Sequence, residues 1–200
     1  HGGWCWQRTA LLLERAGHEV HTPTLSGLSN KAHVLSPAVG LDTHIEDIVR
    51  YIETYDLSDV TLVGHSYGGQ VITGVADRIP DRLARRVHLD GFIGDGRPAI
   101  ELLPDGPAGH YRQSVAEQGF DWLIPLRPLE KLGVTEPLDL EWLTPRLTPH
   151  PWKTYTDELP LVGNHEKVTG VFIESINWMR VFKDYARIAE DSGWDTYTLN

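Results

Sequence analysis

The stretch that decides the fold is TLVGHSYGGQV, residues 61–71. The apolar run VTLVG (60–64) is typical of a strand buried on both faces of a parallel sheet, and residues 68–78 predict a helix. Between them, Gly64-His65-Ser66-Tyr67-Gly68 fits the pattern G-x-S-x-G, in which the chain turns sharply and glycines avoid a steric conflict. We therefore predict a strand-to-helix turn that lifts the Ser66 hydroxyl above the sheet edge as a nucleophile.

The residues upstream of this turn begin with a predicted helix and a short strand. Residues 6–16 predict the helix, with the three leucines 11–13 on its apolar side and Gly17 at its exit. The segment HEVHT (18–22) follows as a predicted strand. Residues 23–40 then form a turn-rich loop.

A second helix is indicated by apolar residues that recur once per turn. Thr43 and Glu46 have capping-box spacing at its start. The recurrence predicts one buried face along the helix. The residues of that face are Leu41, Ile45, Ile48, Val49 and Ile52.

Downstream of the turn, strands and helices continue to alternate. Residues 85–93, 167–174 and 195–199 predict strands, and residues 180–192 predict a helix. Alternation of this kind indicates the α/β class with a parallel sheet.

Residues 95–165 differ in composition from the rest of the chain. They hold ten of the 13 prolines and three of the seven tryptophans. Long segments of this kind are often lids or binding loops. We expect a single domain over residues 1–200 with an inserted cap at about 95–165. Its aromatic side chains either contact an apolar or aromatic part of a substrate or form the core of the cap itself. They are Phe120, Trp122, Trp142 and Trp152.

The composition limits the classes of partner. The chain has 28 acidic residues against 18 lysines and arginines, a formal net charge of −10, whereas nucleic acids and anionic membranes attract clustered positive charge. No apolar run reaches the roughly 20 residues of a membrane-spanning helix, and no histidine spacing indicates a metal site. We expect no nucleic-acid or membrane partner and no cofactor. Cys5 is the only cysteine, which excludes an internal disulfide and favours a cytoplasmic location.

Five segments together resemble the methylesterase and hydroxynitrile lyase branch of the α/β-hydrolase family. This branch includes plant methylesterases and bacterial relatives described as salicylate-esterase-like or pyrethroid-hydrolase-like. The resemblance implies a mostly parallel sheet flanked by helices, with an inserted cap and a catalytic serine. The segments are HGGWCW (1–6), AGHEVHTPTLSG (16–27), VGHSYGG (63–69), LDGFI (89–93) and PWKTYT (151–156).

The resemblance also implies where the catalytic histidine should lie. In such proteins it follows the last strand, and a strand with a first His-Gly pair precedes the HGGW group. The chain starts at HGGW and ends at Asn200, close to where the histidine loop would begin. We therefore expect the first strand and the last loop and helix to be missing, and the 200 residues alone to be inactive. An alternative reading makes His1-Gly2 itself the oxyanion turn.

The other site residues are carried over from the same resemblance. The backbone N–H of Tyr67 would donate to the oxyanion. The usual aspartate falls near Asn177, which has no charge to stabilise an imidazolium, so Glu174 and Asp95 are the candidates for the acid. His65 is adjacent to Ser66, but neighbouring side chains on such a turn point apart, which favours a packing role for this histidine.

These expectations lead to one preferred function and two alternatives. The preferred function is a serine-dependent, carboxylesterase-like hydrolase acting on a small, apolar or aromatic ester. One alternative is a hydroxynitrile-lyase-type C–C lyase, which uses the same serine and histidine without an acyl-enzyme. The other is a non-catalytic binding protein built on a hydrolase fold. The sequence does not indicate an oligomeric state.

Overall fold

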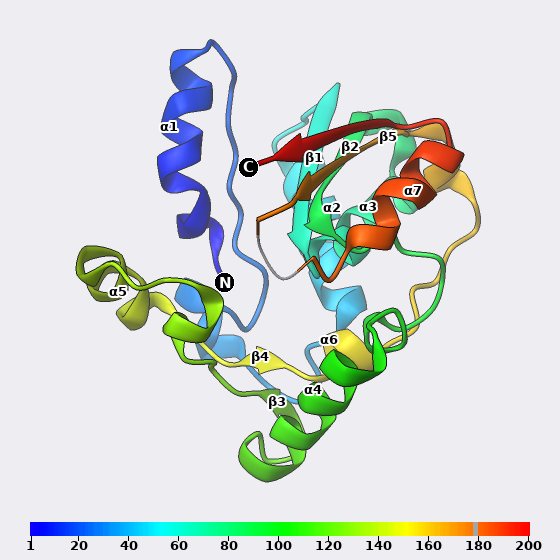
Figure 1. Cartoon of the computed structure of the whole chain (residues 1–200). Coiled ribbons are helices and arrows are strands. Elements are labelled where there is room, and N and C mark those ends of the chain that lie inside the picture. Colours follow the sequence, from blue (N-terminus) through cyan, green and yellow to red (C-terminus); the bar gives the residue numbers. More distant parts are fainter. Residues whose placement is uncertain (178–179) are drawn as a thin grey trace. The chain divides into compact units, whose positions relative to one another are not determined.

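The computed structural model describes residues 1–177 and 180–200 of the chain. The chain divides into two compact units, which are traced along the sequence in Figure 1. The sheet unit consists of residues 40–110 and 153–200, and the N-terminal unit consists of residues 1–39 and 111–152. The predicted turn at Ser66 lies in the sheet unit. The expected organisation as one domain with a cap stays a prediction.

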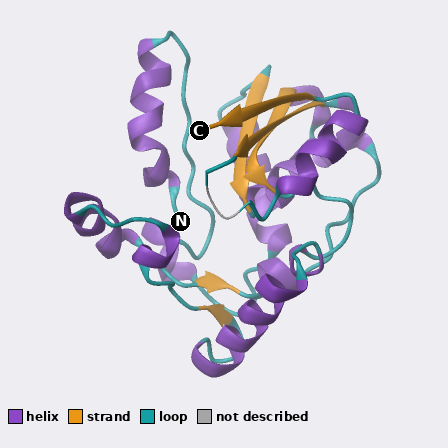
Figure 2. Cartoon of the chain, viewed as in Figure 1, coloured by secondary structure: helices purple, strands orange, loops and turns teal. Residues whose placement is uncertain are grey.

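Four parallel strands form the sheet of the sheet unit, in the order β1-β2-β5-β6 (Figure 2). The parallel sheet predicted from the sequence is thus confirmed, and strand ends differ from the prediction by two residues or fewer. The strands are β1 (Val60–Ser66), β2 (Leu83–Gly91), β5 (Thr169–Ser175) and β6 (Asp195–Leu199).

Three longer helices accompany this sheet: α2 (Leu41–Thr54), α3 (Gly68–Arg78) and α7 (Lys183–Asp191). Helix α3 joins β1 to β2 and α7 joins β5 to β6, and both connections step in the same direction across the sheet. Right-handed crossovers therefore place both helices on one face, and α2 packs against α3. The predicted apolar stripe of α2 is buried along its whole length.

The prediction that β1 is buried on both faces is wrong. Val63 is 43% exposed, and the strand alternates between more and less exposed residues. The reason is that the crossover helices cover one face of the sheet only. Among the described residues β1 pairs with β2 alone, so one of its edges carries no neighbouring strand.

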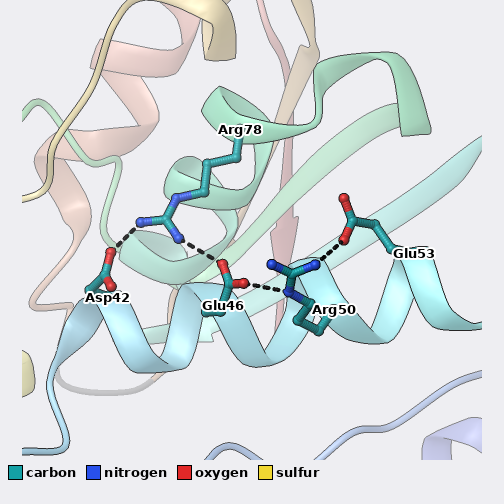
Figure 3. Close-up of polar contacts among 5 residues, drawn as sticks. All are labelled: Asp42, Glu46, Arg50, Glu53 and Arg78. Carbon is teal, nitrogen blue, oxygen red and sulfur yellow. Dashed lines mark hydrogen bonds and ion pairs between the residues drawn. The ribbon is translucent and has the colours of Figure 1, made fainter.

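The start of α2 also differs from the predicted capping box. The backbone N–H of Gly40 donates to Thr43 Oγ1 at 3.4 Å, so Gly40 is the N-cap and Thr43 lies inside the helix. Glu46 instead accepts from Arg50 Nε at 2.6 Å and from Arg78 Nη1 at 3.2 Å (Figure 3). The pair with Arg50 lies within α2, whereas the pair with Arg78 ties the last turn of α3 to α2. Each exposed pair of this kind contributes about 0.2 to 1 kcal/mol.

A buried carboxylate at the C-terminal end of α3 holds residues 162–165, a segment far away in the sequence. Asp77 is 4% exposed, accepts from the N–H of Val162 at 2.7 Å and of His165 at 3.0 Å, and pairs with His165 Nδ1 at 2.9 Å. Burial opposes ionisation, but these hydrogen bonds hold the pKa of Asp77 below its ordinary value. The carboxylate thereby anchors residues 162–165 to α3.

Replacing this carboxylate should destabilise the fold in a pH-dependent way. Asp77→Asn is expected to lower the free energy of unfolding at pH 7 by about 2 to 3 kcal/mol, because charge-assisted hydrogen bonds are lost. The folded-state pKa of Asp77 lies below the unfolded value of about 3.9. Its stabilisation is therefore present above that pH and is lost as the pH falls through the folded-state pKa.

Urea unfolding at pH 7 and at several values below about 4 measures this effect. The exposed Asp81 nearby is the matched control, and Asp81→Asn should change stability by less than about 0.5 kcal/mol. A deficit of the Asp77→Asn variant that stayed constant with pH would contradict the assignment.

The N-terminal unit begins with a 3-10 helix (Gly3–Trp6) and helix α1 (Gln7–Arg15). Gly17 has a φ of 94°, which confirms the predicted helix exit. No residue of α1 is buried, so the predicted apolar side at residues 11–13, between 42% and 64% exposed, does not form a core within the structure.

The predicted strand 18–22 is wrong, because these residues belong to no strand in the described part of the chain. They run beside the 3-10 helix, where the backbone of Gly3 lies so close to Thr22 that a Cβ atom would be 1.7 Å from its carbonyl oxygen. The N–H of Gly3 donates to Thr24 Oγ1 at 3.0 Å. This segment is therefore held by the N-terminal residues and not by a sheet.

The remaining elements are short, apart from α4, which runs across the boundary of the two units. They are α4 (Asp105–Gln118), α5 (Pro137–Leu143), α6 (Lys153–Thr156), and the antiparallel pair β3 (Leu123–Ile124) and β4 (His150–Pro151). Short 3-10 helices cover Ser29–Val34, Pro80–Arg82, Ala99–Glu101, Leu129–Leu132, Thr144–Arg146 and Asn164–Lys167. No helix in the described residues is long and apolar enough to span a membrane.

Candidate active site

Ser66 lies at the junction between strand β1 and helix α3. Strand β1 ends at Ser66, Tyr67 follows, and α3 starts at Gly68. The φ angle of Ser66 is 52°, in the left-handed region that non-glycine residues rarely adopt. Such a backbone costs about 1 to 3 kcal/mol and persists only where the surroundings enforce it. The predicted turn geometry is confirmed, whereas the nucleophilic role of Ser66 stays a prediction.

Backbone contacts around Ser66 explain how the turn is enforced. The N–H of Phe92 donates to the carbonyl of Ser66 at 3.1 Å. A Cβ atom on Gly91 would be 2.8 Å from Ser66 N and O, and one on Gly64 would be 2.5 Å from the carbonyl oxygen of Gly68. Close backbone approach therefore requires glycine at positions 64 and 91.

The second glycine of the motif has no such steric role. Apart from the two chain neighbours and the nearby backbone of α3 itself, no described atom lies within 4 Å of a Cβ atom placed on Gly68, whereas one placed on Gly69 would be 2.0 Å from the carbonyl oxygen of Phe92. The expectation that both motif glycines relieve a conflict is thus met at Gly64 and not at Gly68. The sequence signals that were overlooked are the doubled glycine at 68–69 and the Asp-Gly pair at 90–91.

Tyr67 continues the turn with helical backbone angles, φ −53° and ψ −31°. Its side chain is 7% exposed, and its hydroxyl lies 3.1 Å from His44 Nδ1. Burial raises the pKa of Tyr67 well above its ordinary value, so its hydroxyl stays protonated. The assignment of the Tyr67 N–H as an oxyanion donor stays a prediction.

The two carboxylates predicted as candidate acids each pair with an arginine. Glu174 at the end of β5 is 6% exposed, and its Oε1 accepts from Arg180 Nη2 at 2.7 Å and Nε at 3.1 Å. Asp95 accepts hydrogen bonds from the Arg97 guanidinium through both carboxylate oxygens. Burial opposes ionisation of Asp95, but the hydrogen bonds from Arg97 hold its pKa below the ordinary value.

A third carboxylate, Asp90, was not singled out from the sequence. It lies near the end of β2 at a register shift opposite Ser66 and has a φ of 41°. Its Oδ1 is buried and has no hydrogen-bond partner among the residues that the structure describes. Burial, together with the nearby charge of Glu174, raises the pKa of Asp90, although a hydrogen bond with the Ser175 backbone acts in the opposite direction. The position of Asp90 in LDGFI was its only sequence signal.

The histidines of the sheet unit have other contacts. No described histidine is seen to hydrogen-bond the Ser66 hydroxyl. His65 is exposed, and His165 pairs with Asp77. His88 is fully buried, with Nδ1 2.7 Å from the Phe92 carbonyl. Burial lowers the pKa of His88 to about 3, so it is a neutral core residue. The expectation that the chain alone is inactive stays untested.

The tryptophans that were expected either to contact substrate or to form the core of the cap pack within the N-terminal unit. The ring of Trp142 meets that of Trp4 edge-on, with centroids 5.1 Å apart. The N–H of Trp152 donates to the carbonyl of Trp122 at 2.9 Å, and Phe120 is 80% exposed. Their proposed contact with substrate stays a prediction. No group of side chains that could hold a metal ion occurs in the described part of the chain.

Solved structures with similar folds cover the whole chain. An extracellular α/β-hydrolase from a Paenibacillus species superposes with a TM-score of 0.82 at 22% identity, covering 100% of this chain and 85% of that one. A methylesterase from Arabidopsis gives a TM-score of 0.68 at 22% identity, covering 100% and 84%. At this level of identity the likeness establishes the fold.

Curated relatives extend the similarity to sequence. The carbendazim hydrolyzing esterase of Nocardioides sp. is 37% identical over 206 residues, which cover 97% of this chain and 84% of that protein. Methylesterase 2 of Arabidopsis thaliana is 30% identical over 108 residues, which cover 52% of this chain and 41% of that protein. Residues 1–196 also match the family described as the Alpha/beta hydrolase family. With its parallel sheet and its turn at Ser66, the chain belongs to the α/β-hydrolase family, in the branch that contains the methylesterases.

Proposed function

We propose that this protein is a serine-dependent hydrolase of small carboxylic esters. The observation that carries the proposal is the strained turn at Ser66, with its positive φ between a parallel strand and a helix. A turn of this kind exposes a serine hydroxyl and brings the N–H of the next residue toward the developing oxyanion. The relationship to an esterase that hydrolyses carbendazim supports ester hydrolysis and an apolar or aromatic group in the substrate.

The reaction has two covalent steps. In the first, the Ser66 oxygen attacks the ester carbonyl while a base removes its proton, and the backbone N–H of Tyr67 donates to the oxyanion. Loss of the alcohol, which takes up that proton, leaves an acyl group on Ser66. In the second, water attacks the acyl group, releases the carboxylic acid and restores the hydroxyl.

The acid that would orient the base comes from the carboxylates near the ends of β2 and β5. Glu174 and Asp95 remain candidates, and Asp90 joins them because it alone of the three has a buried oxygen without a partner in the described residues. A carboxylate already bound to an arginine is less available to a histidine, which favours Asp90 over the other two. The base itself is not among the described contacts of Ser66.

Incubation of the native protein with p-nitrophenyl esters and with a fluorophosphonate tests the proposal. We expect ester turnover that stops after a single fluorophosphonate group is bound, and peptide mapping should place that group on Ser66. Turnover that persisted after labelling, or a label on a different residue, would overturn the assignment.

A further inference from the structure

The Tyr67 side chain is fixed by two elements that lie apart in the sequence. Its hydroxyl lies 3.1 Å from Nδ1 of His44, on α2, and shares a hydrogen bond with the side chain of Thr154, on α6. His44 and Thr154 are both fully buried. The Tyr67 ring also stacks on that of Tyr155, with centroids 5.3 Å apart and planes inclined by 19°. Both ends of the Tyr67 side chain are thus held within the sheet unit.

Packing alone does not require a hydroxyl at this position. A phenylalanine would fill the same space, whereas a buried hydroxyl costs free energy unless it is hydrogen-bonded. Here the hydroxyl is bonded and the phenol is held in its protonated form by burial, so it serves as a fixed anchor and not as an acid or base. Two hydrogen bonds to separate elements define the direction of the ring in a way that apolar contacts do not.

The anchored residue is the one whose backbone matters most for the proposed chemistry. Tyr67 directly follows Ser66, and the peptide plane between them sets the direction of the Tyr67 N–H. Its orientation depends on the strained φ of Ser66 and on the position of the Tyr67 Cα atom. Since the Tyr67 ring is held by α2 and α6, that Cα atom cannot shift without breaking the hydroxyl contacts.

We propose that His44 and Thr154 are positioning residues of the oxyanion hole. They act through the Tyr67 hydroxyl and aim the Tyr67 backbone N–H at the oxygen that becomes negatively charged. The inference rests on the proposed ester hydrolysis at Ser66 and assigns a role to two residues that touch no reacting atom.

The chain offers a matched pair of threonines for the test. Thr154 and Thr73 are both fully buried, but Thr73 donates to the carbonyl of Gly69 at 2.9 Å within α3 and not to Tyr67. Thr154→Val removes the anchor, and Thr73→Val removes an equally buried hydroxyl from the neighbouring helix. Tyr67→Phe is the second test variant, because it removes the anchored hydroxyl itself.

The steady-state kinetics of p-nitrophenyl ester hydrolysis separate a positioning role from a structural one. For Thr154→Val and Tyr67→Phe we expect kcat to fall by about tenfold to a hundredfold with little change in KM, since misplacement by a fraction of an ångström acts mainly on the transition state. The affinity for a boronic acid, which forms a tetrahedral adduct on serine, should fall by the same factor. Thr73→Val should leave both quantities within about twofold of the native values.

The NMR chemical shift of the Tyr67 backbone amide provides a readout that does not need activity. It should change in Thr154→Val, because the peptide plane between Ser66 and Tyr67 reorients when the hydroxyl anchor is lost, and stay unchanged in Thr73→Val. Equal effects of both threonine variants on kcat, or an unchanged Tyr67 amide shift in Thr154→Val, would overturn the inference. A native protein without Ser66-dependent turnover would overturn the proposed function instead, and the chemical-shift measurement would still decide whether the anchor exists.

Discussion

Replacing Ser66 by alanine is expected to lower kcat for ester hydrolysis by about 10⁶-fold in the native protein. The reason is that the oxygen that forms the acyl-enzyme is removed, while the backbone that supplies the Tyr67 N–H remains in place. Residual hydrolysis would come from the oxyanion donor and from substrate binding alone. A p-nitrophenyl ester assay sensitive over this range measures the effect, and Ser192→Ala, at an exposed serine that bonds the carbonyl of Ile188 in α7, should leave kcat unchanged.

Stability measurements on two inactive variants test the strain at the same position. Alanine at 66 keeps the positive φ strained, whereas glycine adopts it freely. Ser66→Gly is therefore expected to be as inactive as Ser66→Ala but to raise the free energy of unfolding by about 1 kcal/mol relative to it. A Ser66→Ala variant that kept a tenth of the native activity would disprove the nucleophile. Equal stability of the two variants would show that the turn is not strained.

The second large effect is expected at Gly69. A Cβ atom there would lie 2.0 Å from the carbonyl oxygen of Phe92, so Gly69→Ala forces α3 away from the end of β2. The added Cβ atom and the carbonyl oxygen are both fixed by the backbone and cannot rotate away from each other. The free energy of unfolding should therefore fall by about 3 kcal/mol or more. Urea unfolding measures this loss, and ester turnover should fall as well because the displaced backbone adjoins Ser66.

Gly68→Ala is the control, and its expected result is the opposite. Apart from the two chain neighbours and the nearby backbone of α3 itself, no described atom lies within 4 Å of the added methyl group, and alanine favours a helical conformation over glycine by up to about 1 kcal/mol. Stability should therefore be unchanged or slightly higher. A loss at position 68 as large as that at position 69 would mean that the close approach of α3 to Phe92 has been misplaced.

Patterns internal to one element were read correctly from the sequence. The spacing of Leu41, Ile45 and Ile48 predicted which side of α2 is buried, and Gly17 predicted where α1 ends. The G-x-S-x-G pattern predicted the strand-to-helix turn at Ser66. Each of these features depends on residues within a few positions of one another, so hydrophobic periodicity and backbone sterics determine them without knowledge of the rest of the fold.

Features that depend on a second element were read wrongly or overlooked. The apolar run of β1 was predicted to be buried on both faces, but the number of covered faces depends on which side the crossover helices take. The three leucines of α1 were expected to form an apolar side, and the segment 18–22 was expected to join a sheet. The residues of these segments do not by themselves determine which other segments they contact. Thr43 was taken as a cap because Gly40, which has no side chain, leaves no such signal.

The sequence by itself therefore determined the class of the fold and the turn that presents Ser66, because both follow from short-range sterics and periodicity. Only the tertiary structure decided what encloses that turn. The carbonyl of Phe92 requires glycine at position 69, whereas it leaves position 68 unconstrained. The hydroxyl of Tyr67 contacts His44, which precedes it in the sequence, and Thr154, which follows it. The neighbouring residues in the sequence limit the conformation of a residue, but its tertiary contacts depend on the positions of distant segments. Those contacts determine which polar groups near Ser66 are paired.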